Sequence, residues 1–147
     1  MALTKVTSNV LNDGAVTTTK IVDLNVTTPK IAGDSITNEK AGAEFTTAAA
    51  LTMASPVALD YTAAQVFTLT PNANMTINIT NPVIGVSKVI VITGGGGSST
   101  LTFNVGGAAG TFNKISGDYD DTAATKNFIQ ITCVSNTEFW YSISQIG

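Results

Sequence analysis

The N-terminal part of the chain carries a ten-residue repeat, which constrains the fold more than any other feature of the sequence. Each unit contains a β-branched apolar residue followed by Thr, and most units contain a second apolar residue five positions later. Turn-forming pairs such as Asp13-Gly14 and Gly33-Asp34 separate the units. The large apolar positions of the repeat are Val6, Leu11, Val16, Ile21, Val26, Ile31 and Ile36.

This spacing does not suit a single strand or helix. Residues five positions apart lie on opposite faces of a straight strand, and about 140° apart around a helix. One copy of the segment therefore cannot bury enough apolar area to offset the entropy of ordering it. We expect residues 1–44 to form an extended stem that is ordered by wrapping around identical copies, with these seven apolar side chains at the interface. A disordered, Thr-rich linker is the alternative.

The rest of the chain divides into a connector and a head. Residues 45–56 are rich in Ala and Thr, and we expect a connector there with one or two short helical turns. From residue 57 the pattern changes to period-two segments between turn signals, which predicts an all-β head over residues 57–147, folded as a β-sandwich or jelly roll. The segment Lys88–Thr93 is almost entirely β-branched, which is typical of a strand buried on both faces. Strands are predicted at 57–60, 65–70, 75–79, 88–93, 100–105, 111–114, 127–134 and 138–144.

Composition excludes several classes of function. The chain is only 12% charged, with a net charge of −3, and its seven basic residues are scattered. It therefore lacks the basic patch that nucleic-acid binding requires. No apolar run is long enough for a transmembrane helix, and the N-terminus lacks the features of a signal peptide, so we expect assembly in a cytoplasm and no membrane association. Low charge also suits a surface that is largely covered in an assembly.

Few residues are candidates for chemistry. The chain has no histidine and a single cysteine, Cys133, which the alternation of its segment places on a buried strand face. The Gly94–Gly97 run lacks the Lys of a phosphate-binding loop and precedes a strand pattern, so a flexible hairpin loop is expected. These features, with no cofactor fingerprint, predict that the chain is not an enzyme and binds no cofactor or metal.

Two features remain as candidate ligand-facing groups. Asp118, Asp120 and Asp121 form an acidic cluster, which we interpret as a solvated turn, with a calcium site or part of a glycosidase site as the alternatives. Trp140 lies between two aromatic residues, Phe139 and Tyr141, and alternation places it on the opposite strand face from both. It is therefore either packed or exposed as a platform for a sugar ring.

Several segments resemble fibre proteins of tailed bacteriophages. Residues 13–22, Asp-Gly-Ala-Val-Thr-Thr-Thr-Lys-Ile-Val, match the repeats common in tail fibres. The head is similar to small β-domains at the C-terminal ends of phage fibre and virion proteins. The matching segments are 66–70 with 75–82, then 89–92, 97–103, 127–131 and 138–141.

The resemblance implies a homotrimeric structural protein of the virion. Long tail fibres carry a docking domain before the shaft, whereas this repeat starts near residue 1. We therefore expect a capsid decoration or short head-fibre protein, attached through its stem to the major capsid protein or to a tail protein. The alternative is a receptor-binding tail-fibre tip that recognises a host surface glycan or protein.

Overall fold

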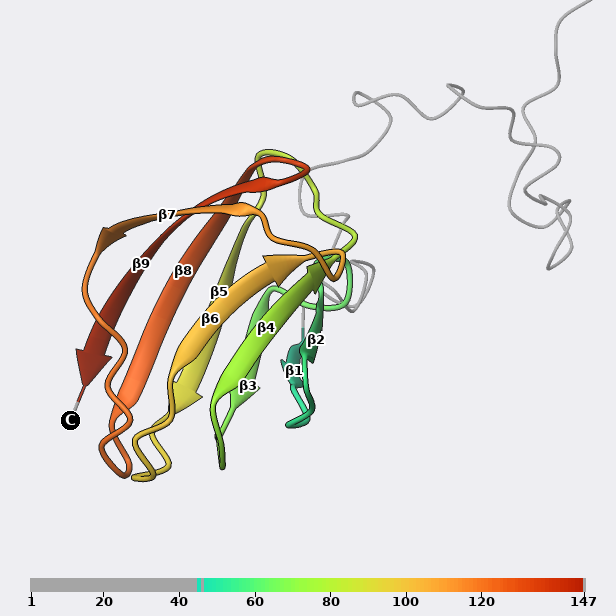
Figure 1. Ribbon diagram of the computed structural model, residues 1–147. Helices are drawn as coiled ribbons and strands as arrows, with labels where there is room; N and C mark the ends of the chain where they lie inside the picture. Colours follow the sequence, from blue (N-terminus) through green and yellow to red (C-terminus); the bar gives the residue numbers. More distant parts are fainter. Residues whose placement is uncertain (1–44, 46, 147) are drawn as a thin grey trace, which may run out of the picture. The chain divides into compact units, whose positions relative to one another are not determined.

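The computed structural model describes residue 45 and residues 47–146, and these form an all-β domain of two sheets (Figure 1). The predicted stem interface, from Val6 to Ile36, lies outside the described residues. The larger sheet has six strands in the order β1-β3-β5-β8-β9-β7, and the smaller has three in the order β2-β4-β6. The strands are β1 (Ala48–Ala50), β2 (Val57–Asp60), β3 (Val66–Leu69), β4 (Met75–Thr80), β5 (Ser87–Thr93), β6 (Leu101–Val105), β7 (Thr111–Ser116), β8 (Lys126–Ser135) and β9 (Glu138–Ile146).

The first seven strands alternate between the two sheets, so the chain coils like a β-solenoid. β1, β3 and β5 pair in parallel in one sheet, and β2, β4 and β6 pair in parallel in the other. The antiparallel hairpin of β8 and β9 then inserts between β5 and β7, and β7 pairs in parallel with β9. The all-β class is thus confirmed, whereas the jelly roll is not, because a jelly roll is built from antiparallel Greek keys rather than parallel coils.

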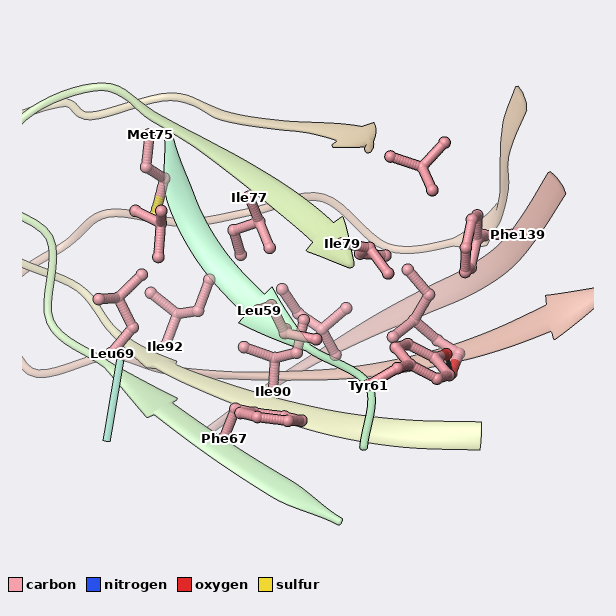
Figure 2. Close-up of a cluster of buried hydrophobic side chains, with 14 of the residues drawn as sticks. Leu59, Tyr61, Phe67, Leu69, Met75, Ile77, Ile79, Ile90, Ile92 and Phe139 are labelled. Atoms are coloured by element: carbon pink, nitrogen blue, oxygen red, sulfur yellow. Dashed lines mark hydrogen bonds between the residues drawn. The ribbon is translucent and has the colours of Figure 1, made fainter. Parts of the chain in front are cut away.

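The core lies between the sheets, and the period-two pattern of the sequence accounts for it. Alternate residues of β4 and β8 are fully buried, and their neighbours face outward. Figure 2 shows the resulting layer of Ile, Leu and aromatic side chains. A run of aromatic rings extends this core toward β7, where Phe112 stacks between Phe103 and Phe139 at centroid distances of 5.4 Å and 5.1 Å.

All eight predicted strands are present, with bounds that differ by at most two residues. The prediction missed β1, because the connector was expected to contain helical turns. Ala48–Ala50 has little intrinsic strand preference, and it is held extended by parallel pairing with Val66–Thr68 of β3. Cys133 is fully buried on the same face as Ile129 and Ile131, as predicted.

Candidate functional site

The acidic cluster and the glycine-rich loop meet around one carboxylate, that of Asp121, although they are separated by more than 20 residues of sequence. Its Oδ1 accepts a hydrogen bond from the Gly95 N–H at 2.8 Å, and its Oδ2 accepts from the N–H groups of Gly97 at 3.0 Å and Ser99 at 2.7 Å. The Tyr119 hydroxyl donates to Oδ1 at 2.8 Å. The loop is therefore an anion cradle whose anion is a side chain of the same protein.

The electrostatics follow from this geometry. The backbone N–H groups of Gly95 and Ser99 are the main reason that the pKa of Asp121 falls from 3.8 to about 2. Burial, followed by the hydrogen bond to Asp121, raises the pKa of Tyr119 above its ordinary value. With this lowered pKa the buried Asp121 side chain is ionised at neutral pH, and its carboxylate fills the cradle.

Close backbone approaches explain why this loop is rich in glycine. A Cβ atom on Gly94 would lie 2.1 Å from the Thr122 carbonyl oxygen, and one on Gly95 would lie 2.4 Å from the Pro71 carbonyl oxygen. Both contacts are with backbone atoms that cannot move aside without breaking the loop. The sequence pattern indicated these glycines only as flexible turn residues. The pattern did not predict that a carboxylate binds this loop. The one available indication is that a run of backbone N–H groups in a packed loop needs a hydrogen-bond acceptor.

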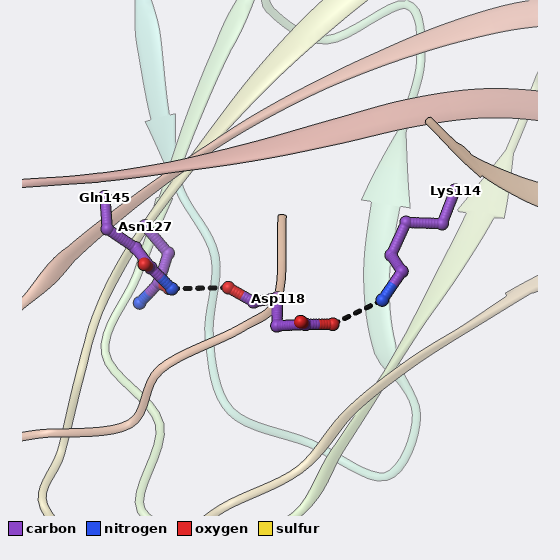
Figure 3. Close-up of polar contacts among 4 residues, drawn as sticks. All are labelled: Lys114, Asp118, Asn127 and Gln145. Atoms are coloured by element: carbon purple, nitrogen blue, oxygen red, sulfur yellow. Dashed lines mark hydrogen bonds and ion pairs between the residues drawn. The ribbon is translucent and has the colours of Figure 1, made fainter. Parts of the chain in front are cut away.

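Asp120 and Asp118 belong to the segment leading to this site, and neighbouring strands hold it in place. Asn127 is fully buried, accepts a hydrogen bond from the Asp120 N–H at 2.9 Å and donates one to the Asp120 carbonyl at 2.7 Å. Figure 3 shows Gln145 donating to the Asp118 carbonyl while the Asp118 carboxylate pairs with Lys114. The Asp120 carboxylate accepts hydrogen bonds from the Thr122 hydroxyl and N–H, which lower its pKa.

These three aspartates therefore have different roles. The interpretation as a solvated turn describes Asp118, whose side chain is 85% exposed, but it does not describe Asp121, which is 8% exposed. Among the described residues, no group of three or more His, Cys, Asp or Glu side chains is arranged to hold a metal ion. A shallow polar depression of about 420 Å³ remains beside Asp120, lined by Gly96, Ser98 and Thr122.

Trp140 is exposed and lies away from the acidic segment. Its side chain is 48% exposed, while Phe139 on the other face of β9 is fully buried. Trp140 Nε1 donates to Glu138 Oε1 at 2.9 Å, and the same oxygen accepts from Asn113 Nδ2 at 3.0 Å. Trp140 is paired with Thr132 near the β8–β9 turn, about 17 Å along β9 from Gln145, so the structure does not bring it together with the aspartates.

A buried lysine is a feature that no local sequence pattern indicated. Lys88 lies on the inward face of β5, is 3% exposed, and places its ammonium 5.6 Å from the centroid of the Tyr61 ring. The Tyr61 hydroxyl donates to the Ile131 carbonyl at 2.9 Å, which ties the ring to β8. A pocket of about 200 Å³ adjoins these groups, with Phe45 and Val83 among its apolar lining residues.

The comparisons with known proteins identify no relative. No protein-family model matches the chain, and no curated protein and no solved structure shows significant similarity to it. In the part of the chain that the structure describes, no helix is long and apolar enough to cross a membrane.

Proposed function

We propose that this protein is a structural component of a bacteriophage virion, a homotrimeric capsid decoration or short fibre protein. The observation that carries the proposal is the combination, on one chain, of the fibre-like repeat over residues 13–22 and an all-β head. The head is stiffened by stacked parallel pairing and by the core between its sheets, which suits a protein that must keep its shape on a particle surface.

The chemistry of the head supports a structural role. Asp121, the most perturbed carboxylate of the acidic segment, is engaged by four internal donors and serves the fold. Perturbed groups often mark active sites, but structural networks perturb pKa values as well. In this proposal the repeat attaches the protein to the major capsid protein or a tail protein, in the host cytoplasm where the particle is assembled.

The test is attachment to particles that lack the protein. Purified full-length chain is mixed with such particles, which are then sedimented and assayed for bound protein, and its position and copy number are determined by electron microscopy. We expect saturable binding at a fixed ratio to capsid or tail subunits. A matched variant in which Ile21 and Ile31 are replaced by Asp is expected to bind much less, with the β-sheet signal of the head unchanged. Equal binding of both proteins, or no binding of either, would refute the proposal.

A second candidate function is adhesion to a host glycan, and the exposed Trp140 favours it. An indole beside a carboxylate and an amide, here Glu138 and Asn113, has the character of a sugar-stacking site with adjacent polar groups. Binding of the full chain to host cells is the measurement, with Trp140→Ala compared with the exposed control Ile84→Ala. Adhesion predicts that only the Trp140 variant loses cell binding.

A further inference from the structure

The outer faces of the two sheets differ in chemistry. On the three-stranded sheet the outward side chains are small or polar, and two of them, Thr76 and Thr102, hydrogen bond to each other at 2.8 Å across the strands. Side chains of these types are mostly exposed to solvent in folded proteins, so the chemistry of this face does not call for a partner. The outward side chains of this sheet are Ala58, Asp60, Thr76, Asn78, Thr80, Thr102 and Asn104.

The outer face of the six-stranded sheet is apolar at its centre. The strand register aligns Val66 with Val89 and Gln130 in one row, and Val91 with Phe128 in the next. Phe128 is 44% exposed, and the valines are only half-buried. We call these five residues, Val66, Val89, Gln130, Val91 and Phe128, the central patch.

Charge is confined to the ends of this face on the two longest strands. Lys126 begins β8 and pairs with Ile146 at the end of β9. Glu138 begins β9 and pairs with Ser135 at the end of β8, which is the opposite end of the face. The rows between them contain Trp140, Ser142 and Ser144 on β9, which are uncharged. A neutral face with a charged rim has the anatomy of a protein–protein interface.

The sequence of β5 adds an independent argument. Its β-branched pattern is typical of a strand that is buried on both faces. In a single chain only one face meets this condition, because Ile90 and Ile92 are fully buried while Val89 and Val91 remain accessible. A partner on the outer face would complete the burial that the pattern predicts.

The dimensions suit another copy of the same chain. Six strands span about 24 Å, and seven residues of a strand span about 23 Å, which gives a face of about 550 Å² and about 1,650 Å² for the three faces of a trimer. This total is within the roughly 1,200–2,000 Å² that specific protein–protein association buries. If three such faces form the sides of a triangular prism, the middle of each sheet lies about 7 Å from the threefold axis. In a pair of packed sheets, each sheet lies about 5 Å from the plane midway between them. The additional space at the middle suits a large side chain such as that of Phe128.

We propose that the outer face of the six-stranded sheet is the surface through which copies of this chain pack together, with the central patch nearest the symmetry axis. The inference rests on the self-association included in the proposed function and specifies which face of the head makes it. The face of the three-stranded sheet then remains exposed on the outside of the assembly.

Thiol labelling of the full-length protein tests this proposal. Gln130→Cys places a thiol in the central patch and Thr102→Cys places one on the opposite face, both at exposed positions. Maleimide labelling rates are measured together with the mass in solution, with the wild-type protein and its buried Cys133 as the baseline. We expect a trimer in which Gln130→Cys reacts at least about tenfold more slowly than Thr102→Cys, because the centre of an interface excludes water. Ser144→Cys serves as a second probe of the same face.

Each other outcome overturns the inference in a different way. A trimer in which both thiols react equally, or in which only Thr102→Cys is protected, places the interface elsewhere and leaves the trimer intact. Protection of Gln130→Cys only after binding to virions assigns the face to another virion protein. If the protein is a monomer and both thiols react, the chain does not self-associate. The particle-binding assay then tests separately whether the protein is a virion component.

Discussion

The role of Asp121 gives the most direct test of how this head is held together. Replacing it with Asn keeps the size of the side chain but turns one acceptor oxygen into a donor. In either orientation of the amide, an NH₂ group then faces two donors, either the N–H groups of Gly97 and Ser99 or the Gly95 N–H and the Tyr119 hydroxyl. Two charge-assisted hydrogen bonds are lost, and buried donors are left without acceptors.

The magnitude can be obtained from the pKa. A fall from 3.8 to about 2 corresponds to about 2 kcal/mol of preferential stabilisation of the ionised form. The unsatisfied donors add a further cost, so we expect Asp121→Asn to lower the free energy of unfolding by about 2–4 kcal/mol. For a head of this size that corresponds to a fall in Tm of about 10–20 °C.

The pH dependence gives a second readout. Because the pKa of Asp121 is lower in the folded than in the unfolded state, its contribution is fully present above about pH 4 and is lost as pH falls toward about 2. Wild-type stability should decrease over this window by about 2 kcal/mol more than that of the Asp121→Asn protein, as measured by urea unfolding at successive pH values.

Asp118→Asn is the matched control, because that side chain is 85% exposed and its partner Lys114 is also at the surface. We expect no measurable change in Tm for this variant. If Asp121→Asn and Asp118→Asn unfold alike, or if the acid sensitivity of the Asp121→Asn protein equals that of the wild type, the filled cradle does not stabilise the head.

Three further predictions concern the core and the loop around it. Gly94→Ala should cost at least about 2 kcal/mol in urea unfolding, because the new Cβ would lie 2.1 Å from the Thr122 carbonyl oxygen, and near-wild-type stability would contradict the described loop. Cys133 should stay unreactive toward a thiol reagent until the head unfolds, because it is fully buried and burial raises the pKa of its thiol. Rapid labelling of the native protein would contradict the burial of this thiol. Tyr61→Phe should lower stability by about 1 kcal/mol by removing the hydrogen bond to the Ile131 carbonyl, and an unchanged urea midpoint would show that this bond contributes nothing.

The strands of the head could be predicted from the sequence because the signal for each is local. Alternation along Met75–Thr80 and Lys126–Ser135 places the buried residues correctly, and the breaks contain glycine, proline or asparagine. The aromatic residues Phe139 and Trp140 were likewise placed on opposite faces of one strand, as found. Local patterns therefore determined which residues enter the core.

The connectivity could not be predicted, because it depends on which strands pair. A sequence of short strands separated by turns is compatible with antiparallel keys or with parallel coils, and nothing local to β3 or β5 distinguishes them. The strand β1 could not be predicted for the same reason, because its three alanines have little strand preference of their own and pair with β3. Asp121 was misjudged for a related reason, since its hydrogen-bond donors come from a loop more than 20 residues earlier.

The placement of the β8–β9 hairpin between β5 and β7 has a consequence for the order of folding. Among the described strands, β7 pairs only with β9, whose residues follow it by 26 or 27 positions, and the contact between β5 and β8 spans 33 to 45 residues. The earlier coils can pair as they leave the ribosome, but the larger sheet stays in two parts until β9 has been synthesised. Contacts of this range slow folding. The outer face of the six-stranded sheet is therefore complete only once β9, the last described strand, has paired with β7 and β8.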